Sequence, residues 1–310
     1  MNTRKLMPSI EKHLRKDREY IKPSENSHEG LIVPELVLKY GSFWSKARSI
    51  PNLGHYMIGC LHQIMKSYRE LYKQPEDPKQ EISRKDLSEL VSLAEDLGAC
   101  SMGYTEVEPS YIFRNKGILY KNAIVLSIRM DHDKISTAPS KAAEKEIFRT
   151  YYRLNVAVNK IKDFLNERGY NAHAGPALGG EVNYPLLAQK AGMGAIGKHG
   201  LLITPENGPS IRLAAVFTDI GNLPFGETNE HMWIPEFCEG CNICVKKCPA
   251  SAIYKETLVL EDSSEMHVDY KKCAVPFSKD RGCTVCVKEC VFFRTDYDKI
   301  KAGFMKKVSN

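Results

Sequence analysis

The sequence predicts an α+β protein in which a larger domain of helices and strands is followed by a small cysteine-rich domain. A long amphipathic pattern over residues 141–168 predicts a helix. Two short, apolar, β-branched segments at 122–128 and 211–217 predict buried strands. Eight of the ten cysteines lie within residues 238–290, which indicates that they share one chemical task.

The predicted helices have identifiable ends. Ser83 and Asp86 can form a capping box at the start of the first helix, and Gly98 fits its end. Gly169 fits the end of the long helix, and a shorter helical segment follows at 184–192. The apolar face of the long helix consists of Leu154, Val158, Ile161 and Leu165.

Proline-containing segments suggest how the chain is divided. Residues 222–236 separate the last predicted strand from the cysteines, so we place one domain at 1–225 and a second at 226–310. Residues 1–35 are polar and interrupted by prolines, which predicts an arm on the surface of the first domain. No motif identifies the task of residues 1–80.

The composition is that of an ordinary globular protein. The chain has 310 residues, 43% of them hydrophobic and 26% charged, with a formal net charge of +6. The lysines are scattered along the chain, which does not favour a nucleic-acid partner. The sequence shows no signal-peptide pattern and no segment apolar enough to cross a bilayer, so we expect a cytoplasmic protein.

The cysteine spacing predicts two iron-sulfur clusters. The run Cys-x2-Cys-x2-Cys-x3-Cys-Pro is typical of bacterial 4Fe-4S proteins, in which its fourth cysteine ligates the other cluster. This rule predicts a crossed pairing that uses all eight thiols. One cluster would be ligated by Cys238, Cys241, Cys244 and Cys290. The other would be ligated by Cys248, Cys273, Cys283 and Cys286.

Structural zinc and disulfides are the alternatives for these cysteines. Zinc sites commonly use paired Cys-x2-Cys knuckles separated by a spacer, which a run of cysteines followed by Pro249 fits poorly. Disulfides suit small secreted domains rather than a chain with its cysteines gathered in one segment. Cys60 and Cys100 lie outside that segment, and we expect both to be buried as small apolar residues.

A glycine-rich turn precedes the second predicted strand. Residues 192–197 match the dinucleotide pattern G-x-G-x-x-G, but a helix precedes the turn and a strand-like segment follows it, which is the wrong order for that motif. The glycines instead predict a loop whose backbone approaches something large. The loop residues that we expect to contact it are Gly192, Met193, Gly194, Gly197, Lys198, His199 and Gly200.

Taken together, the loop and the cysteines resemble a known family. Residues 191–219, followed by FCEGCNICVKKCPASAI, resemble the corrinoid-binding and iron-sulfur half of reductive dehalogenases. They are more distantly similar to epoxyqueuosine reductase, a tRNA-modifying enzyme of the same superfamily. The likeness extends from about Ile124 to Cys290.

This resemblance implies a nitroreductase-like sheet that binds cobalamin base-off, with the glycine-rich loop as part of its site. Two 4Fe-4S clusters would deliver electrons singly to the cobalt. The implied partners are a small organic substrate and a low-potential electron donor such as ferredoxin or flavodoxin. A homodimer is left open, and neither a membrane nor nucleic acid is expected.

The resemblance also implies a tyrosine that donates a proton near the start of the long helix. We prefer Tyr152 to Tyr151, since an alignment on Tyr152 puts Val156 and Ile161 where the helix of the family is apolar. A nearby cation would stabilise the phenolate left after proton transfer. Lys198 is the first candidate for this cation and Arg212 the second. His173 and His199 are not expected to ligate cobalt, because the family uses no histidine there.

Three functions follow from these expectations. The first is a corrinoid-dependent reductase that removes halide or another leaving group from a small molecule. The second is an epoxyqueuosine reductase-like enzyme. Two features disfavour it: a tyrosine stands where that family has an aspartate, and only 20 residues follow Cys290, where that family continues into helical repeats that help hold tRNA. The third is an electron-transfer or corrinoid-handling protein without a substrate of its own. The missing twin-arginine leader disfavours a membrane-bound respiratory role.

Overall fold

The computed structural model describes residues 8–15, 17–25, 27, 39–40, 43–226, 228–260 and 265–309, and of residues 43–48 and 50 the backbone alone. Much of the predicted arm at 1–35 therefore lies outside the described residues. Within the described part, Ile10 is fully buried and packs with Ile64 and Tyr68. Ile21 forms an isolated bridge with Ile118.

A four-stranded antiparallel sheet forms the centre of the larger domain. Its strands are β1 (Ser101–Glu106), β2 (Asn122–Arg129), β3 (Ala172–Gly175) and β6 (Ile211–Thr218), in the order β1-β2-β6-β3. Strands β2 and β6 pair along their whole length, from Asn122 opposite Thr218 to Arg129 opposite Ile211. Both strands predicted from the sequence are confirmed.

One face of the sheet is covered by two predicted helices, α3 (Arg84–Asp96) and α5 (Lys141–Glu167). The residues of β6 alternate between faces, so Ala214 and Val216 pack toward α5, against Leu154 and Val158. The Ser83 side chain accepts a hydrogen bond from the Asp86 amide at 3.0 Å, which confirms the predicted cap.

The opposite face of the sheet packs against α6 (Tyr184–Lys190), the shorter predicted helix. Ala215 and Phe217 of β6 lie on this face, in contact with Leu187. Cys60 is buried as expected. The expectation for Cys100 was wrong: it is exposed, because it lies just before β1 at the edge of the sheet, where its thiol contacts Ser127.

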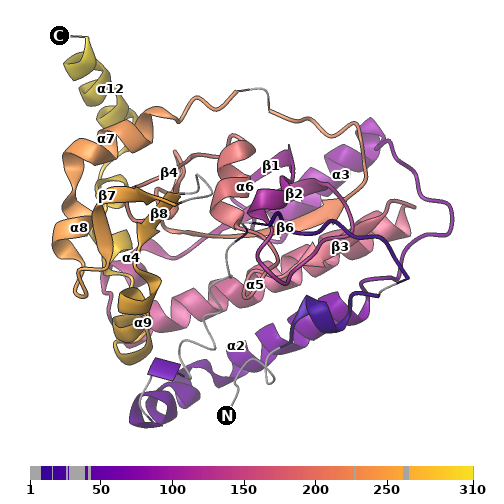
Figure 1. The fold of residues 1–310 in the computed structure, drawn as a ribbon, viewed down its shortest axis with the longest axis horizontal. Helices are drawn as coiled ribbons and strands as arrows, with labels where there is room; N and C mark the ends of the chain where they lie inside the picture. Colours follow the sequence, from indigo (N-terminus) through magenta and orange to yellow (C-terminus); the bar gives the residue numbers. More distant parts are fainter. Residues whose placement is uncertain are drawn as a thin grey trace.

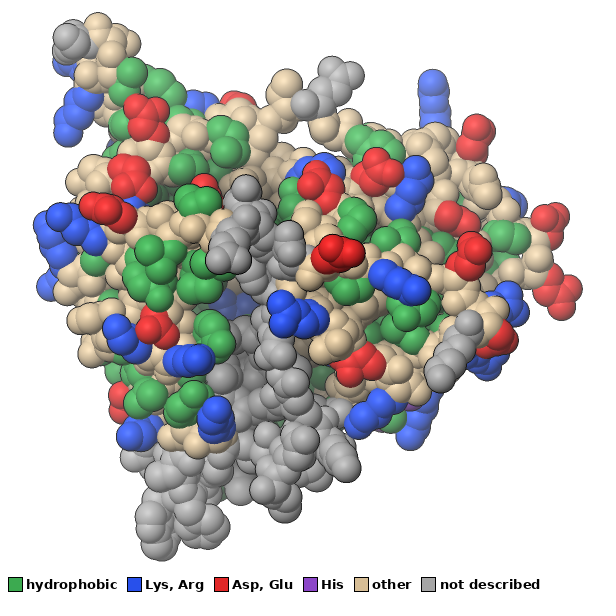
Figure 2. All heavy atoms as spheres, in the orientation of Figure 1, with side chains coloured by type: hydrophobic (Ala, Val, Ile, Leu, Met, Phe, Trp, Pro, Cys, Tyr) green, Lys and Arg blue, Asp and Glu red, His purple; other side chains and the backbone are tan. Residues whose placement is uncertain are grey.

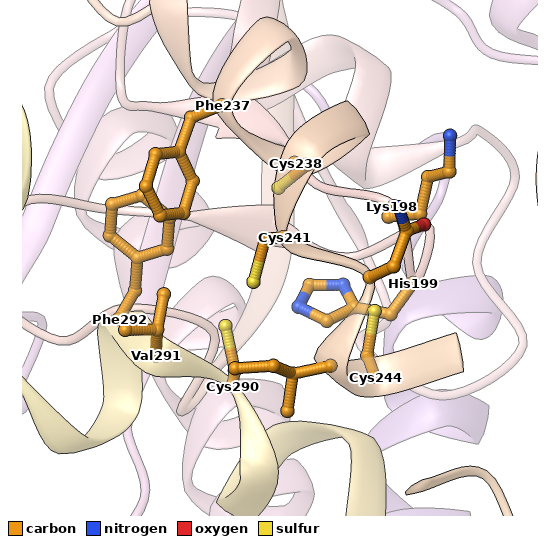
Figure 3. Close-up of a pocket in the computed structure, with 11 residues that line it drawn as sticks. Lys198, His199, Phe237, Cys238, Cys241, Cys244, Cys290, Val291 and Phe292 are labelled. Atoms are coloured by element: carbon orange, nitrogen blue, oxygen red, sulfur yellow. The ribbon is translucent and has the colours of Figure 1, made fainter. Parts of the chain in front are cut away.

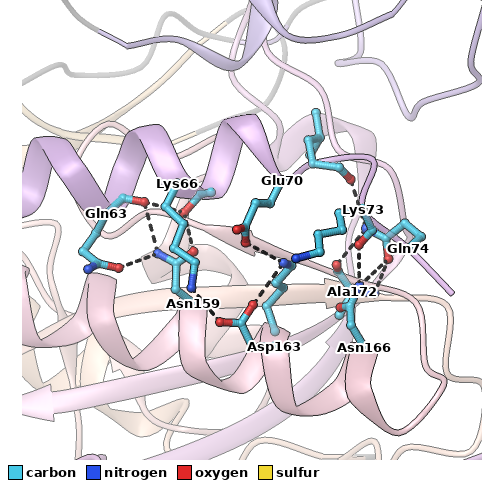
Figure 4. Close-up of polar contacts among 12 residues, drawn as sticks. Gln63, Lys66, Glu70, Lys73, Gln74, Asn159, Asp163, Asn166 and Ala172 are labelled. Atoms are coloured by element: carbon cyan, nitrogen blue, oxygen red, sulfur yellow. Dashed lines mark hydrogen bonds and ion pairs between the residues drawn. The ribbon is translucent and has the colours of Figure 1, made fainter.

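A helix that the sequence did not predict, α2 (Phe43–Arg69), packs along the outer side of α5 (Figure 1). Polar groups join the two helices (Figure 4). Lys162 of α5 donates to Glu70 at 2.9 Å and to Asp163 at 3.1 Å. Asn159 donates to the backbone carbonyl of Gln63 at 3.1 Å. These contacts fix α2 over the helix that carries the two candidate tyrosines.

The cysteine-rich domain lies at one end of α5 (Figure 1). Arg281 forms an ion pair with Glu144 of α5 at 3.1 Å, and both side chains are largely buried. His132 stacks on Phe293 with 4.2 Å between ring centroids. The remaining elements are η2 (Ile10–Lys12), η3 (Pro109–Tyr111), α4 (His132–Ser136), β4 (Ala195–Ile196), β5 (Leu202–Ile203), α7 (Trp233–Cys241), α8 (Ile243–Lys247), β7 (Ile253–Val259), β8 (Glu265–Val268), α9 (Tyr270–Lys279), α10 (Val285–Glu289), α11 (Val291–Arg294) and α12 (Tyr297–Val308).

The surface of the described residues carries both signs of charge. On the face shown in Figure 2, basic and acidic side chains are interspersed over both domains. Among the described residues, none of the helices is apolar over a length that would cross a bilayer.

Candidate functional site

Four cysteines from two parts of the chain line one pocket, which we call the cysteine pocket (Figure 3). They are Cys238, Cys241, Cys244 and Cys290, the first cysteine group. The pocket has an empty volume of about 290 Å³. Asn242 stands between α7 and α8 with φ 53°, a left-handed conformation that asparagine tolerates better than most residues. This turn allows cysteines of both short helices to face the pocket.

The other walls of the cysteine pocket come from both domains. Lys198 and His199 belong to the turn between β4 and β5 in the larger domain. Phe237, Val291 and Phe292 supply apolar walls from the cysteine-rich domain. The pocket is therefore built where the two predicted domains meet.

Burial favours the protonated form of three thiols of this group. Burial raises the pKa of Cys238 to about 12, although the backbone amide of Lys198 donates a hydrogen bond to this thiol. Burial likewise raises the pKa of Cys244 to about 11 and that of Cys290 to about 12. Because iron binds the thiolate, its binding must displace these protons and will be strongly pH-dependent.

The second cysteine group is Cys248, Cys273, Cys283 and Cys286. Burial, followed by the nearby Cys248 and Cys283 thiols, raises the pKa of Cys273 to about 11. Cys286 has its pKa raised above the usual range by burial, with smaller effects from Cys273, Cys283 and other cysteines. Cys248 thus lies with cysteines far along the chain, although Cys244 is only four residues away.

The structure brings together the two sets of thiols that the crossed pairing predicts. All ten cysteines are free thiols. In the part of the chain that the structure describes, no three Cys, His, Asp or Glu side chains form a site for a single metal ion. The first group, with three buried thiols and one partly buried thiol around one pocket, fits a cubane cluster, which needs four thiolates around it. The second group offers four partly buried thiols. The assignment of each ligand stays a prediction.

The glycine-rich loop folds as the β4–β5 hairpin and lines the cysteine pocket. A side chain at Gly194 would collide with the carbonyl oxygen of Ile203, and one at Gly197 would collide with the Ile203 side chain. These two glycines thus allow close packing within the hairpin itself. Contact between the loop and a corrinoid remains a prediction.

Lys198 and His199 both point from this hairpin toward the cysteine-rich domain. Lys198 is buried and forms an ion pair with Glu239 of α7. His199 is also buried, and its Nδ1 atom accepts a hydrogen bond from the Leu201 amide at 3.2 Å. Burial, with a smaller effect from His267, lowers the pKa of His199 to about 4, so the ring is neutral at pH 7.

Of the two candidate tyrosines, Tyr151 contacts a candidate cation. The guanidinium of Arg212 lies over its ring, 5.1 Å from the ring centroid. Tyr151 also packs against the apolar cluster that contains Cys238 and Cys290. Tyr152 lies against α2, with its ring 6.2 Å from that of Tyr56 and in close contact with Gly59. The structure thus pairs the second-choice cation, Arg212, with the second-choice tyrosine.

Three buried polar atoms near this pair have no hydrogen-bond partner among the described residues. They are Arg212 Nε, Ser210 Oγ and Asn155 Nδ2. Arg212 of β6 alternates onto the α5 side of the sheet, Ser210 lies just before β6, and Asn155 lies one helical turn after Tyr151. Unpaired polar atoms are costly to bury, so water or a bound polar group is needed to complete their hydrogen bonds. The sequence analysis missed Ser210 and Asn155, for which strand alternation and i, i+4 spacing were the available signals.

His173, which we did not expect to ligate cobalt, is buried in the core of the larger domain. Its Nε2 atom accepts a hydrogen bond from the Leu119 amide at 3.1 Å, and its ring stacks on Phe217 at 4.8 Å. Burial lowers its pKa to about 3. These contacts indicate that His173 has a structural role in the core.

The fold and the two cysteine groups define the class: a protein that joins an α+β sheet domain to an iron-sulfur domain. The 4Fe-4S binding domain family matches residues 231–254, which include Cys238, Cys241, Cys244 and Cys248.

Both kinds of relative that the sequence resembles are found among known proteins. A tetrachloroethene reductive dehalogenase of Sulfurospirillum multivorans is 32% identical over 181 residues, 56% of this chain and 35% of that protein. An epoxyqueuosine reductase of Listeria monocytogenes is 25% identical over 252 residues, 66% of this chain and 64% of that protein. The chain thus spans about a third of the length of the dehalogenase and about two thirds of that of the other relative.

A solved structure also has this fold. A catabolic reductive dehalogenase in complex with 3-bromo-4-hydroxybenzoic acid matches with a TM-score of 0.62 and 20% identity, over 78% of this chain and 38% of that one. These comparisons confirm the predicted resemblance: reductive dehalogenases and epoxyqueuosine reductases, both reductases, are homologues of this chain. They also confirm the α+β fold followed by an iron-sulfur domain.

Proposed function

We propose that this protein is a cobalamin- and iron-sulfur-dependent reductase that replaces a halogen, or another leaving group, by hydrogen on a small organic molecule. The observation that carries the proposal is the contact between Tyr151 and Arg212 beside the core that contains Cys238 and Cys290. It joins a possible proton donor, a fixed positive charge and the thiols of one cluster in a single region. The homologues among reductive dehalogenases support the same reaction class.

The proton is the part of the reaction that this chain supplies directly. Replacement of a carbon-halogen bond by a carbon-hydrogen bond takes up two electrons and one proton and releases halide. The Tyr151 hydroxyl would donate that proton. The Arg212 guanidinium, held over the ring, would stabilise the phenolate that remains. Solvent would then return the proton to Tyr151.

When bound, a corrinoid supplies the strongly reducing cobalt centre that such a bond requires. The unpaired polar atoms of Arg212, Ser210 and Asn155 fit a polar ligand in this region. The residues that would hold the corrinoid are those of the predicted loop from Gly192 to Gly200, together with these polar groups.

The two cysteine groups would hold the clusters that bring in electrons from an external donor such as ferredoxin or flavodoxin. The first group shares its pocket with Lys198 and His199 of the predicted corrinoid loop. This shared wall supports a position of the first cluster, rather than the second, next to the proposed reaction site. Electrons would therefore reach the proposed reaction site through the first cluster.

The test is anaerobic reconstitution with iron, sulfide and cobalamin, followed by an assay with a chemical reductant. Wild-type protein should bind about eight irons per chain and retain corrinoid. It should release halide from at least one member of a panel of halogenated phenols and ethenes. Failure to retain corrinoid would refute the proposal.

A parallel sample should contain tRNA with epoxyqueuosine. Conversion to queuosine without halide release would favour the epoxyqueuosine reductase-like alternative. Retention of both cofactors with no turnover in either sample would favour a corrinoid-handling or electron-transfer protein instead.

A further inference from the structure

His199 lies in the wall of the cysteine pocket with one ring nitrogen unused. The residue is 4% exposed. Figure 3 shows its ring among Cys241, Cys244 and Cys290, which line the same pocket. The Nε2 atom is buried and has no hydrogen-bond partner among the described residues. The fold therefore buries the ring in this wall, and no protein group among the described residues forms a hydrogen bond with its Nε2 atom.

The backbone determines which nitrogen carries the proton. The amide of Leu201 donates to Nδ1 at 3.2 Å, so Nδ1 must present its lone pair. A neutral imidazole then carries its proton on Nε2. The hairpin thus holds a hydrogen-bond donor in a fixed direction, and the donor belongs to a neutral ring.

The polar neighbours of His199 in the pocket do not use this donor. The ammonium group of Lys198 is a donor itself and pairs with Glu239. The Oδ1 atom of Asn242 is buried without a partner and so does not accept from His199. The side chains of Phe237, Val291 and Phe292 have no acceptor. Among the side chains that line the pocket, the sulfur atoms of the first cysteine group are the acceptors that remain.

We propose that His199 donates a hydrogen bond from Nε2 to a sulfur of the cluster bound by the first cysteine group, and thereby raises the reduction potential of that cluster. Hydrogen bonds to cluster sulfurs stabilise negative charge, and the reduced cluster carries one electron more than the oxidised one. The bond is thus stronger in the reduced state. The inference rests on the proposed first cluster and does not depend on the substrate or the corrinoid.

This role gives the two clusters different tasks. An electron that enters the protein would reside preferentially on the cluster next to the β4–β5 hairpin, because the donor that stabilises it comes from that hairpin. His199 is a positioning residue in this scheme, since it acts on the reaction through the cluster.

Potentials measured by EPR-monitored redox titration test the proposal in reconstituted full-length protein. His199→Leu removes the donor and should lower one of the two midpoint potentials by about 59 mV. This shift corresponds to an equilibrium constant for reduction that is about tenfold smaller. His199→Gln keeps an N–H group and should recover part of that change. His267→Leu is the matched control, because His267 lies beside His199 but does not line the pocket. Equal midpoints in wild-type protein and His199→Leu would contradict the proposal.

A second measurement starts from wild-type protein, in which no substitution can disturb cluster assembly. Wild-type protein labelled with 15N-histidine should show a 15N coupling to one reduced cluster in pulsed EPR. His267→Leu should retain this coupling, and His199→Gln should lose it. If the cluster signals were intact but showed no 15N coupling, the role of His199 would be refuted and the proposed first cluster would stand. The absence of a first-cluster signal in wild-type protein would instead refute the proposed cluster.

Discussion

The guanidinium of Arg212 lies 5.1 Å from the centroid of the Tyr151 ring. The two residues come from different elements, β6 and α5, that are packed together in the core. Their contact is therefore set by the tertiary fold and not by a local motif. A partly buried cation over an aromatic ring is stabilising, and it holds the phenol in one orientation.

The first prediction separates the two tyrosines. Tyr151→Phe should lower kcat for halide release by about 100-fold or more, because the proton donor is removed. Tyr152→Phe should change kcat only a few-fold, since this ring packs on Gly59 and Tyr56 of α2. Iron and corrinoid content, measured in the same samples, should match wild type. The reverse order of effects would show that Tyr152 is the donor.

The second prediction concerns the charge beside Tyr151. Arg212→Met should lower kcat by about tenfold or more and leave KM little changed, since the charge acts on the phenolate formed during reaction. Arg212→Lys should retain part of the activity. Steady-state kinetics on both variants provide the measurement. A change confined to KM would mean that Arg212 binds substrate instead.

The third prediction is a pH dependence of stability that originates at Glu181. This residue is fully buried, and burial raises its pKa from 4.5 to about 7. The folded protein then keeps a proton that the unfolded chain releases between pH 4.5 and pH 7. The free energy of unfolding should therefore fall across that range as pH rises, by about 3 kcal/mol in total from this group.

Urea unfolding under anaerobic conditions at several pH values measures this effect. Glu181→Gln should remove most of the loss of stability and be the more stable protein at pH 8. Glu95→Gln, at an exposed position of α3, serves as the control and should follow wild type. Parallel pH profiles for wild type and Glu181→Gln would contradict the prediction.

The fourth prediction concerns the attachment of α2 to α5. Lys162 is 4% exposed in its side chain and pairs with Glu70, the residue that follows α2, and with Asp163 of α5. Lys162→Met should destabilise the protein by about 1 to 3 kcal/mol, because two partly buried carboxylates lose a shared cation. Lys85→Met removes an exposed pair with Glu89 and should cost no more than about 0.5 kcal/mol. Similar urea midpoints for the two variants would contradict this view of the interface.

Local patterns predicted the parts of this protein that local physics determines. The capping of the helix at Ser83 and the strands β2 and β6 depend on neighbours in sequence, and the sequence analysis placed them correctly. The choice of cation was harder. Whether Arg212 faces α5 depends on the register and alternation of β6, and Lys198 is turned toward Glu239 by the β4–β5 hairpin. The direction of neither side chain can be predicted from the spacing of residues in the sequence alone.

The last prediction tests the crossed arrangement of the cysteines. Cys290 stands in the second part of the cysteine array yet lines the pocket of Cys238, Cys241 and Cys244. Cys290→Ala and Cys241→Ala should therefore lose the same EPR signal, although the two cysteines are 49 positions apart in the sequence. Each variant should bind about four irons fewer than wild type.

Cys248→Ala should lose the other EPR signal, because its thiol lies with Cys273 and Cys283. Cys60→Ala, at a buried site in α2 away from both groups, is the control and should bind iron as wild type does. If Cys248→Ala and Cys241→Ala lost the same signal, each cluster would be ligated by consecutive cysteines. The shared cysteine pocket would then need another explanation.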